Sequence, residues 1–449
     1  MKQTEIGLIP DDWEVKSLGE VATIVGGGTP STLNSAYWNG DIQWFTPAEL
    51  SDSKKYVSKS ERTITERGLK ESSAKLLPKG TVLLTTRASI GITAILENPA
   101  STNQGFQSLI AKNNCCSEFL YYVIPLIKDE MLSRASGSTF AEISAKKLST
   151  ITFQLPPLPE QQRIAKALSD VDALISTTEK LIQKKKNIKQ GAMQELLTGK
   201  KRLPGFGDKQ TDLFVPNGTH TKEVKDVSPE QIRLSAKMKQ TELGEIPEDW
   251  EVKALNELIN DISDGPFGSN LKTEHYTTER EVRIIQLSNV GEDGWDNENV
   301  KYTTFTHAKE IQRCIVPYGS IVIAKMMPAG RAILCPNKEK MYILGSDCVR
   351  ISPNNLLDSL FFMYFSKTSF YLNQIKENTQ GSTRARTSVS KLKRIEIALP
   401  SKEEQTAIAN VLSSMDKEIE TLNTKLEKYR NLKTAMMQQL LTGKIRLVK

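Results

Sequence analysis

The sequence predicts an α+β fold, in which two tandem α/β domains are separated by two long helices that pair as a coiled coil. The 449 residues are too many for one compact core. The opening MKQTEIGLIPDDWEV at Met1 returns almost unchanged as MKQTELGEIPEDWEV at Met238. A stretch that starts GST at Gly137 returns at Gly381, and the long apolar-periodic segment after each copy ends in LLTGK. The chain is therefore predicted to hold two copies of one unit.

The repeats also predict the boundaries of the parts. They place the first domain at 1–155, the first helix at 156–199, a loosely structured connector at 200–237, the second domain at 238–398, the second helix at 399–443 and a tail at 444–449. The central segments of the two domains differ in sequence, because VGGGTPSTLNSAYW in the first copy aligns with ISDGPFGSNLKTEHY in the second. We therefore expect both units to act in the same way on two different targets.

Each repeat ends in one long helix with a narrow apolar stripe. Its apolar residues recur at intervals of three and four, the pattern of a coiled-coil seam. The predicted seam consists of Ile164, Leu168, Val171, Ile175, Ile182, Leu196, Ile408, Leu412, Met415, Ile419, Leu422, Leu426, Tyr429, Met436 and Leu440. Prolines precede both helices, and Gly199 and Gly443 can end them in the left-handed conformation. Pairing of the helices is expected; separate packing on each domain is the alternative, and the direction of pairing stays open.

Short apolar runs predict the strands of both domains. Residues 79–97 and 319–334 each show two β-rich runs around a turn. Segments 117–132 and 357–375 have helical patterns at equivalent places in the two repeats. We therefore expect the same mixed, twisted sheet with a few helices in each domain.

Composition excludes several classes of protein. Lys plus Arg against Asp plus Glu is 16 to 16 in residues 1–155 and 20 to 21 in residues 238–398, so any nucleic-acid contact must come from local patches. Five cysteines without a CxxC pair and three scattered histidines predict neither a disulfide framework nor a metal site. There is no membrane-spanning apolar run and no leader, so a cytoplasmic location is expected.

Four motifs resemble one known family. GGGTPS…YWNGDIQWFTPAEL, DGPFGSNLK, the GST…LP…EQ entrance to each helix and the LLTGK.RL exit resemble the specificity subunit of type I restriction-modification enzymes. The resemblance implies two target-recognition domains and two spacer helices in an antiparallel coiled coil, with pseudo-two-fold symmetry. Each domain would read one half of an interrupted site in double-stranded DNA, and the helices would set the gap. One departure is the connector, which carries some thirty extra residues after Phe206.

The resemblance also implies the partners. Two modification subunits would dock on the helices and methylate adenine with S-adenosylmethionine, and restriction subunits would supply the ATP- and magnesium-dependent translocase and nuclease. This chain would hold no cofactor and would not be an enzyme. A fused adenine methyltransferase is the alternative, although the sequence lacks an (N/D)PP(Y/F) loop and a cofactor-binding glycine motif. A coiled-coil scaffold that never meets DNA is another.

Basic and small polar residues supply the candidate DNA contacts. Arginine can pair bidentately with guanine, and serine, threonine and lysine can hold phosphates. The candidates are Gly137, Ser138, Thr139, Arg87, Lys54, Lys55, Gly381, Ser382, Thr383, Arg384, Arg386, Lys325 and Arg331. For each of them a solvated loop without a ligand is the alternative.

Four other motifs are interpreted as structural or solvated. The Gly26–Gly28 run lacks the GxxxxGK[ST] pattern of a phosphate loop, and we expect a turn where two backbones approach closely. Trp38 and Trp44 could stack on bases, but core packing is expected. PDDWEVK and PEDWEVK contain pieces of a nuclease metal site crowded into one short stretch, so we reject that function. The lysines at 184–186 and 189 are expected on a solvated face of the first helix, and contact with a partner subunit or with the DNA backbone is the alternative.

Overall fold

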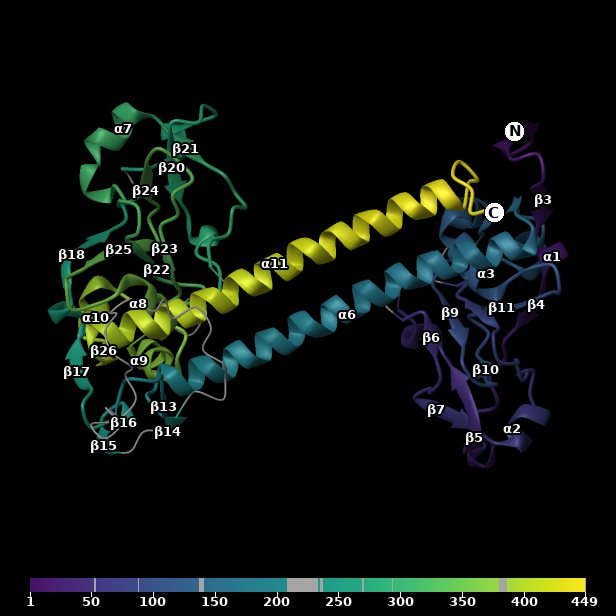
Figure 1. Ribbon diagram of the computed structural model, residues 1–449, viewed down its shortest axis with the longest axis horizontal. Coiled ribbons are helices and arrows are strands. Elements are labelled where there is room, and N and C mark those ends of the chain that lie inside the picture. The colour runs from purple at the N-terminus through teal and green to yellow at the C-terminus, as the bar shows by residue number, and fades with distance from the viewer. Residues whose placement is uncertain are drawn as a thin grey trace, which may run out of the picture. The chain divides into compact units, whose positions relative to one another are not determined.

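A computed structural model describes residues 1–51, 54–87, 89–136, 141–207, 237–268, 270–292, 294–378 and 386–448, and the backbone of 233–234. The chain divides into two compact units. The first comprises Met1–Lys180 with Thr424–Lys449, and the second comprises Leu181–Asn423. Each unit therefore contains one α/β domain and one part of each long helix (Figure 1). No helix within the described ranges has both the length and the apolar character that crossing a membrane requires.

The two long helices run antiparallel within each unit. They are α6 (Leu158–Leu196) and α11 (Lys402–Leu440). In the first unit, Asp172 pairs with Lys433 at 2.6 Å, and Glu179 with Arg430 at 2.8 Å. Residues later in α6 therefore pair with residues earlier in α11, so the two helices run in opposite directions. Ion pairs in the second unit follow the same rule, which confirms the coiled coil and sets its direction.

The second unit corrects the interpretation of two of the four lysines at 184–186 and 189, whereas Lys184 and Lys186 are exposed as expected. Lys185 pairs with Glu418 at 2.7 Å, and Lys189 pairs with Asp416. The side chain of Lys189 is only 15 % exposed, so it is not on a solvated face. These two lysines occupy the part of α6 between Ile182 and Leu196, where the apolar stripe is interrupted.

Most residues of the predicted seam are shielded from solvent. Its buried members are Ile164, Leu168, Val171, Ile182, Leu196, Ile408, Leu412, Ile419, Leu426 and Leu440. Its half-buried members are Ile175, Met415, Leu422, Tyr429 and Met436. The seam also has a position that we did not predict, because Thr178 is buried and bonds to the carbonyl of Leu174. The ends of the stripe also belong to the domain cores, since Ile164 packs in the first domain's core and Ile408 in the second's.

The first domain is built around one five-stranded sheet (Figure 1). The strand order is β4 (Ala22–Gly26), β11 (Gln107–Ala111), β8 (Val82–Leu84), β9 (Thr93–Leu96) and β6 (Tyr56–Val57). A second sheet has the order β10 (Ser101–Thr102), β5 (Trp38–Phe45) and β7 (Arg62–Ile64). Two antiparallel pairs join β1 (Lys2–Thr4) to β2 (Gly7–Ile9), and β3 (Glu14–Ser17) to β12 (Thr152–Leu155). The short helices of the first domain are α1 (Leu18–Val21), α2 (Glu66–Lys70), α3 (Ser117–Val123), α4 (Lys128–Arg134) and α5 (Ala145–Ser149).

The second domain repeats this plan with two four-stranded sheets. One has the order β18 (Ile259–Asp264), β25 (Cys348–Pro353), β22 (Ile321–Ala324) and β23 (Ala332–Leu334), and the other β19 (Tyr276–Thr277), β21 (Tyr302–Thr303), β20 (Val282–Ile285) and β24 (Tyr342–Leu344). The remaining pairs are β13 (Lys201–Arg202) with β14 (Arg233–Leu234), β15 (Met238–Thr241) with β16 (Gly244–Pro247), and β17 (Glu251–Ala254) with β26 (Glu396–Leu399). Its helices are α7 (Phe305–Glu310), α8 (Ser359–Phe365), α9 (Ser369–Asn378) and α10 (Val389–Leu392).

The predicted hairpins and helices are present, with one difference. β8 with β9 and β22 with β23 confirm the hairpins at 79–97 and 319–334. Each predicted long helix of the domains is divided in two, because a 3₁₀ segment (Ile124–Ile127) that contains Pro125 lies between α3 and α4, and a short turn separates α8 from α9. Three of these sheets are mixed as expected, since β6 and β9, β10 and β5, and β20 and β24 run parallel. The sheet of β18, β25, β22 and β23 is antiparallel.

Two glycines mark the same close approach in both domains. A Cβ atom on Gly27 would lie 1.9 Å from the carbonyl oxygen of Asn103, and one on Gly265 would lie 2.0 Å from that of Gly345. No larger residue fits where the two backbones cross. This confirms our interpretation of the Gly26–Gly28 run as a close-approach turn, and shows why both divergent motifs keep a glycine there.

The repeated opening is part of a buried ion-pair cluster in the second unit. Arg202 lies in β13, just after the first helix, and is 5 % exposed. Its guanidinium binds Glu404 at 2.6 Å and Asp249 at 2.9 and 3.0 Å. The indole nitrogen of Trp250 donates to Glu404 at 3.1 Å. The hydrogen bonds from Arg202 hold the pKa of Asp249 below its usual value.

The first unit contains the same cluster, made from the other ends of the repeats. Arg446 follows the second helix and binds Asp12 at 2.7 Å and Glu160 at 2.8 Å. Trp13 donates to Glu160 at 3.0 Å. The tail of one repeat thus completes the unit that holds the opening of the other. The first residues of the predicted connector and the predicted tail are therefore ordered parts of these clusters; residues 208–232 and 235–236 lie outside the described range.

Candidate functional site

Two loops that the sequence singled out separately meet in each domain. In the second domain the amide of Thr387 donates to the carbonyl of Lys325 at 2.9 Å, and Met326 bridges to Arg386. In the first domain the amide of Ile143 donates to the carbonyl of Thr86 at 3.1 Å, and Arg87 bridges to Glu142. The hairpin tip therefore lies beside the segment that follows the GST motif in both domains.

Several predicted contacts cannot be placed. Gly137, Ser138, Thr139, Gly381, Ser382, Thr383 and Arg384 lie outside the described residues. Their proposed DNA contacts remain predictions. The described flanks at Ser136 and Glu142, and at Arg386, fix where each motif leaves and rejoins the domain.

Two of the predicted arginines are accessible at these loops. Arg87 is 49 % exposed and lies 3.8 Å from Glu142, and Arg386 is 51 % exposed and lies 3.0 Å from Asp347. An ion pair this exposed contributes on the order of 0–1 kcal/mol. Either guanidinium can therefore exchange its carboxylate for a phosphate or a base at little cost.

Lys325 and Lys55 need a correction, because neither ammonium group is free. Lys325 is 4 % exposed and pairs with Asp264, so its charge is neutralised inside the second domain and we no longer expect it to contact DNA. Lys55 is half-buried, and its ammonium bonds to Ser169 on α6 and lies 4.7 Å from the ring centre of Tyr122. Burial lowers the pKa of Lys55. Both lysines therefore have structural partners.

The other two predicted cations differ in exposure. Lys54 is exposed. Arg331 is half-buried and donates to the carbonyl of Met327 at 2.8 Å, which ties the hairpin tip of the second domain together. Trp38 and Trp44 are buried, as predicted, in an edge-to-face pair 5.1 Å apart that Arg62 covers at 3.7 Å from the Trp38 ring.

A contact that sequence reasoning missed joins each domain to the paired helices. In the second unit the hydroxyl of Tyr364 donates to Asp416 of α11 at 2.6 Å, and Asp416 pairs with Lys189 of α6. In the first unit Tyr122 donates to Asp172 of α6 at 2.6 Å, and Asp172 pairs with Lys433 of α11. We call these two Tyr–Asp–Lys sets the junction clamps. The signal was present in the sequence, since each member stands at the equivalent position of the other repeat.

The clamp leads to a stability prediction. Tyr364→Phe should lower the free energy of unfolding of the second unit by about 1.5–3 kcal/mol, because a hydrogen bond to a charged group is lost. Tyr371→Phe is the matched control. Its hydroxyl is buried and has no hydrogen-bond partner among the described residues, so its removal should be neutral or stabilising. Denaturant unfolding of both variants measures the difference, and equal effects would contradict the clamp.

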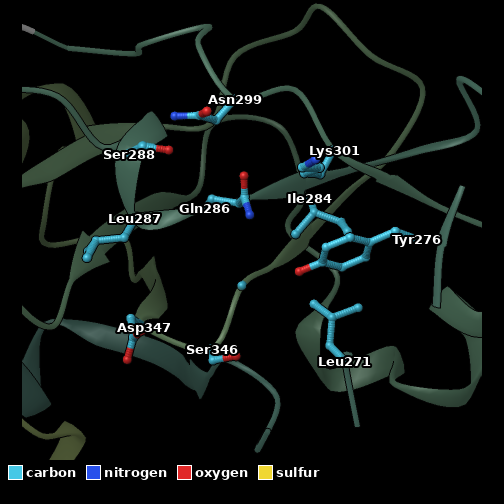
Figure 2. A pocket seen from close by; sticks show the side chains of 11 residues that line it. Leu271, Tyr276, Ile284, Gln286, Leu287, Ser288, Asn299, Lys301, Ser346 and Asp347 are labelled. Carbon is cyan, nitrogen blue, oxygen red and sulfur yellow. The ribbon is translucent and has the colours of Figure 1, made fainter. Parts of the chain in front are cut away.

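The second domain also has an open pocket beside Asp347 (Figure 2). It has a volume of about 390 Å³ and carries the polar side chains of Gln286, Ser288, Asn299 and Lys301. Among the described residues, no group of three or more His, Cys, Asp and Glu side chains could hold a metal ion. The second domain therefore presents a polar surface with accessible cationic side chains.

Comparison with known proteins gives this surface a context. The family described as "Type I restriction modification DNA specificity domain" matches residues 10–189 and 247–428, once in each repeat. The MjaIX specificity subunit of a type I restriction enzyme from Methanocaldococcus jannaschii is 28 % identical over 99 % of this chain and 96 % of its own length. The EcoR124I/EcoR124II specificity subunit of Escherichia coli is 33 % identical over 36 % of this chain and 42 % of its own.

Solved structures show the same fold. The S subunit of a type I restriction-modification system from M. genitalium aligns with a TM-score of 0.56 and 13 % identity, over 98 % of each chain. A chain from a structural study of complex assembly in a type I system aligns with a TM-score of 0.54 over 98 % of this chain and 100 % of its own. These relatives are named specificity subunits of type I restriction enzymes. The chain therefore belongs to the family of type I restriction-modification DNA specificity subunits.

Proposed function

We propose that this protein is the DNA-reading subunit of a type I restriction-modification complex. Each target-recognition domain reads one half of an interrupted site in double-stranded DNA, and the paired helices set the gap. The observation that carries the proposal is the repetition of one frame around two different surfaces. Both units keep the ion-pair cluster and the junction clamp, whereas the residues at the loops differ.

The accessible arginines support contact with DNA. Arg87 and Arg386 lie at the loop junctions of their domains, and both have partners that they can leave at little cost. Positive side chains supply most of the sequence-independent affinity for a duplex, and arginine reads guanine in the major groove. Because the two domains carry different side chains at these loop junctions, they are suited to reading two different half-sites.

The partners follow from the same proposal. Two modification subunits dock on the helical region, bind S-adenosylmethionine and methylate adenine, and restriction subunits add the ATP- and magnesium-dependent activities. The cofactors belong to those partners and none to this chain. The complex would act in the cytoplasm, where its DNA is.

Binding to duplex DNA tests the proposal. Affinity should be sequence-selective and should fall steeply with salt, because phosphate contacts release counterions. We expect selectivity to be strongest when a modification subunit is present. Absence of salt-sensitive, sequence-selective binding with and without that subunit would favour a scaffold that never meets DNA. Methyl transfer by the purified chain alone would favour a fused methyltransferase.

Reciprocal variants test the assignment of half-sites. Arg386→Ala should relax one half-site, and Arg87→Ala the other, each by about 1–3 kcal/mol if a bidentate base contact is lost. Sequencing the DNA selected by each variant from a random pool measures the change. If both substitutions weaken all sequences equally, the arginines contact phosphates and not bases.

A further inference from the structure

The pocket of the second domain combines unpartnered amides with an apolar wall. Figure 2 shows Gln286, Asn299 and Lys301 on one side of it, with Ser346 and Asp347 across from them. Leu271, Ile284 and the ring of Tyr276 form the apolar part. Among the described residues, the side chains of Gln286, Asn299 and Lys301 have no hydrogen-bond or ion-pair partner. Gln286 is half-buried, and Asn299 and Lys301 are exposed, so these side chains can bind a polar ligand in the pocket without first losing a partner in the protein.

The backbone at Gln286 is held by hydrogen bonds, whereas its side-chain amide has no partner among the described residues. Gln286 follows β20, a central strand of its sheet. Its backbone amide donates to Asn289 at 2.9 Å, and the fully buried Asn289 donates in turn to the carbonyls of Asp296 and Glu298 at 3.0 and 2.7 Å. A free side chain on a rigid support is the arrangement that precise recognition requires.

A buried arginine holds the segment that carries Asn299 and Lys301, on the same side of the pocket as Gln286. Arg283 is 1 % exposed, and its guanidinium lies 3.3 Å from the carbonyl oxygen of Lys301 and 3.5 Å from that of Asn299. It contacts the backbone of these residues and leaves their side chains free to face the pocket. Gln286, Asn299 and Lys301 are therefore all carried by backbone that buried polar groups hold.

The first domain lacks this arrangement at the equivalent turn. There the residue that follows β5 is Thr46, and both its amide and its hydroxyl bond to Glu49, at 2.6 and 2.8 Å. The side chain of Thr46 is therefore engaged within its own turn, whereas that of Gln286 is not. Any recognition through this turn belongs to the second domain.

We propose that the pocket reads one A·T base pair of the second half-site, with Gln286 on the adenine edge and the apolar wall next to the thymine methyl. A glutamine amide offers one donor and one acceptor, which match N7 and the N6 amino group of adenine. Apolar side chains contact the thymine methyl in the same groove. The inference rests on the proposed function and adds which residue decides one of its bases.

Gln286→Glu tests the proposal, because it replaces the amide donor by an acceptor without a change of shape. The purified full chain, with its modification subunit, selects duplexes from a random pool. We expect preference for adenine at one position of one half-site to fall by about 5- to 150-fold. Cytosine, whose N4 amino group donates to a carboxylate, should gain there. The other half-site should not change, which shows that the variant is folded. Asn337→Asp is the control, since this exposed amide lies outside the pocket.

A base analogue gives a second readout. Replacing that adenine by 7-deazaadenine removes N7, so wild-type affinity should fall while that of Gln286→Ala should not fall further. An unchanged half-site in Gln286→Glu, or equal loss with the analogue in both proteins, would overturn the role of the pocket and leave the proposed function standing. Failure of the wild-type protein to select any site would overturn both.

Discussion

Replacing Arg202 by alanine should lower the free energy of unfolding of the second unit by about 3–5 kcal/mol, because it leaves a buried carboxylate without its partner. Glu404 is 1 % exposed and takes hydrogen bonds from Arg202 and Trp250. Without the guanidinium the carboxylate of Glu404 keeps, among the residues that the structure describes, the hydrogen bond from the Trp250 indole. Hydrogen exchange of the second unit measures the loss and separates it from the first unit.

Two further variants control this result. Arg446→Ala removes the equivalent group of the first unit, but Arg446 is 24 % exposed, so water can compensate part of the loss and a smaller effect is expected. A double variant, Arg202→Met with Glu404→Leu, should recover much of the stability, because removing both charges also removes the desolvation cost. If Arg202→Ala stays within about 1 kcal/mol of the wild type, the cluster does not stabilise the unit.

The sequence predicted the frame well because the frame is repeated. Trp13 and Trp250 stand in the same sequence context in the two repeats. Apolar residues at intervals of three and four leave few alternatives to a paired helix. The structure adds why the opening recurs. Asp12 and Asp249 each bind an arginine from the tail of the other repeat, so both openings serve as anchors.

The sequence predicted the polar contacts less well, for a physical reason. Charge in the sequence does not reveal burial, so Lys325 and Lys55 resembled free cations although Asp264 and Ser169 bind them in the folded units. Gln286 carried no signal at all, because an amide in a divergent segment becomes a candidate only when the pocket around it is seen.

A deletion of seven residues from each long helix should shorten the DNA gap and leave both half-sites unchanged. Residues 174–180 of α6 and 425–431 of α11 face one another in the first unit, as the pair of Glu179 and Arg430 shows. Their removal keeps the seam in phase, because seven residues are close to two helical turns. It also keeps the junction clamps that contain Lys433 and Lys189.

The expected change in the gap follows from helix and duplex geometry. Seven residues rise about 10 Å along a helix, and a base pair rises about 3.4 Å, so the gap should lose about three base pairs. Selection of bound duplexes from a random pool measures the gap and the half-sites together. Removing two residues from each helix is the control, because two residues turn a helix by roughly 200° and take the seam out of phase, which should cost stability without giving a defined shorter gap. An unchanged gap in the seven-residue variant would mean that the helices do not set the spacing, and the two domains would then have to find their half-sites independently.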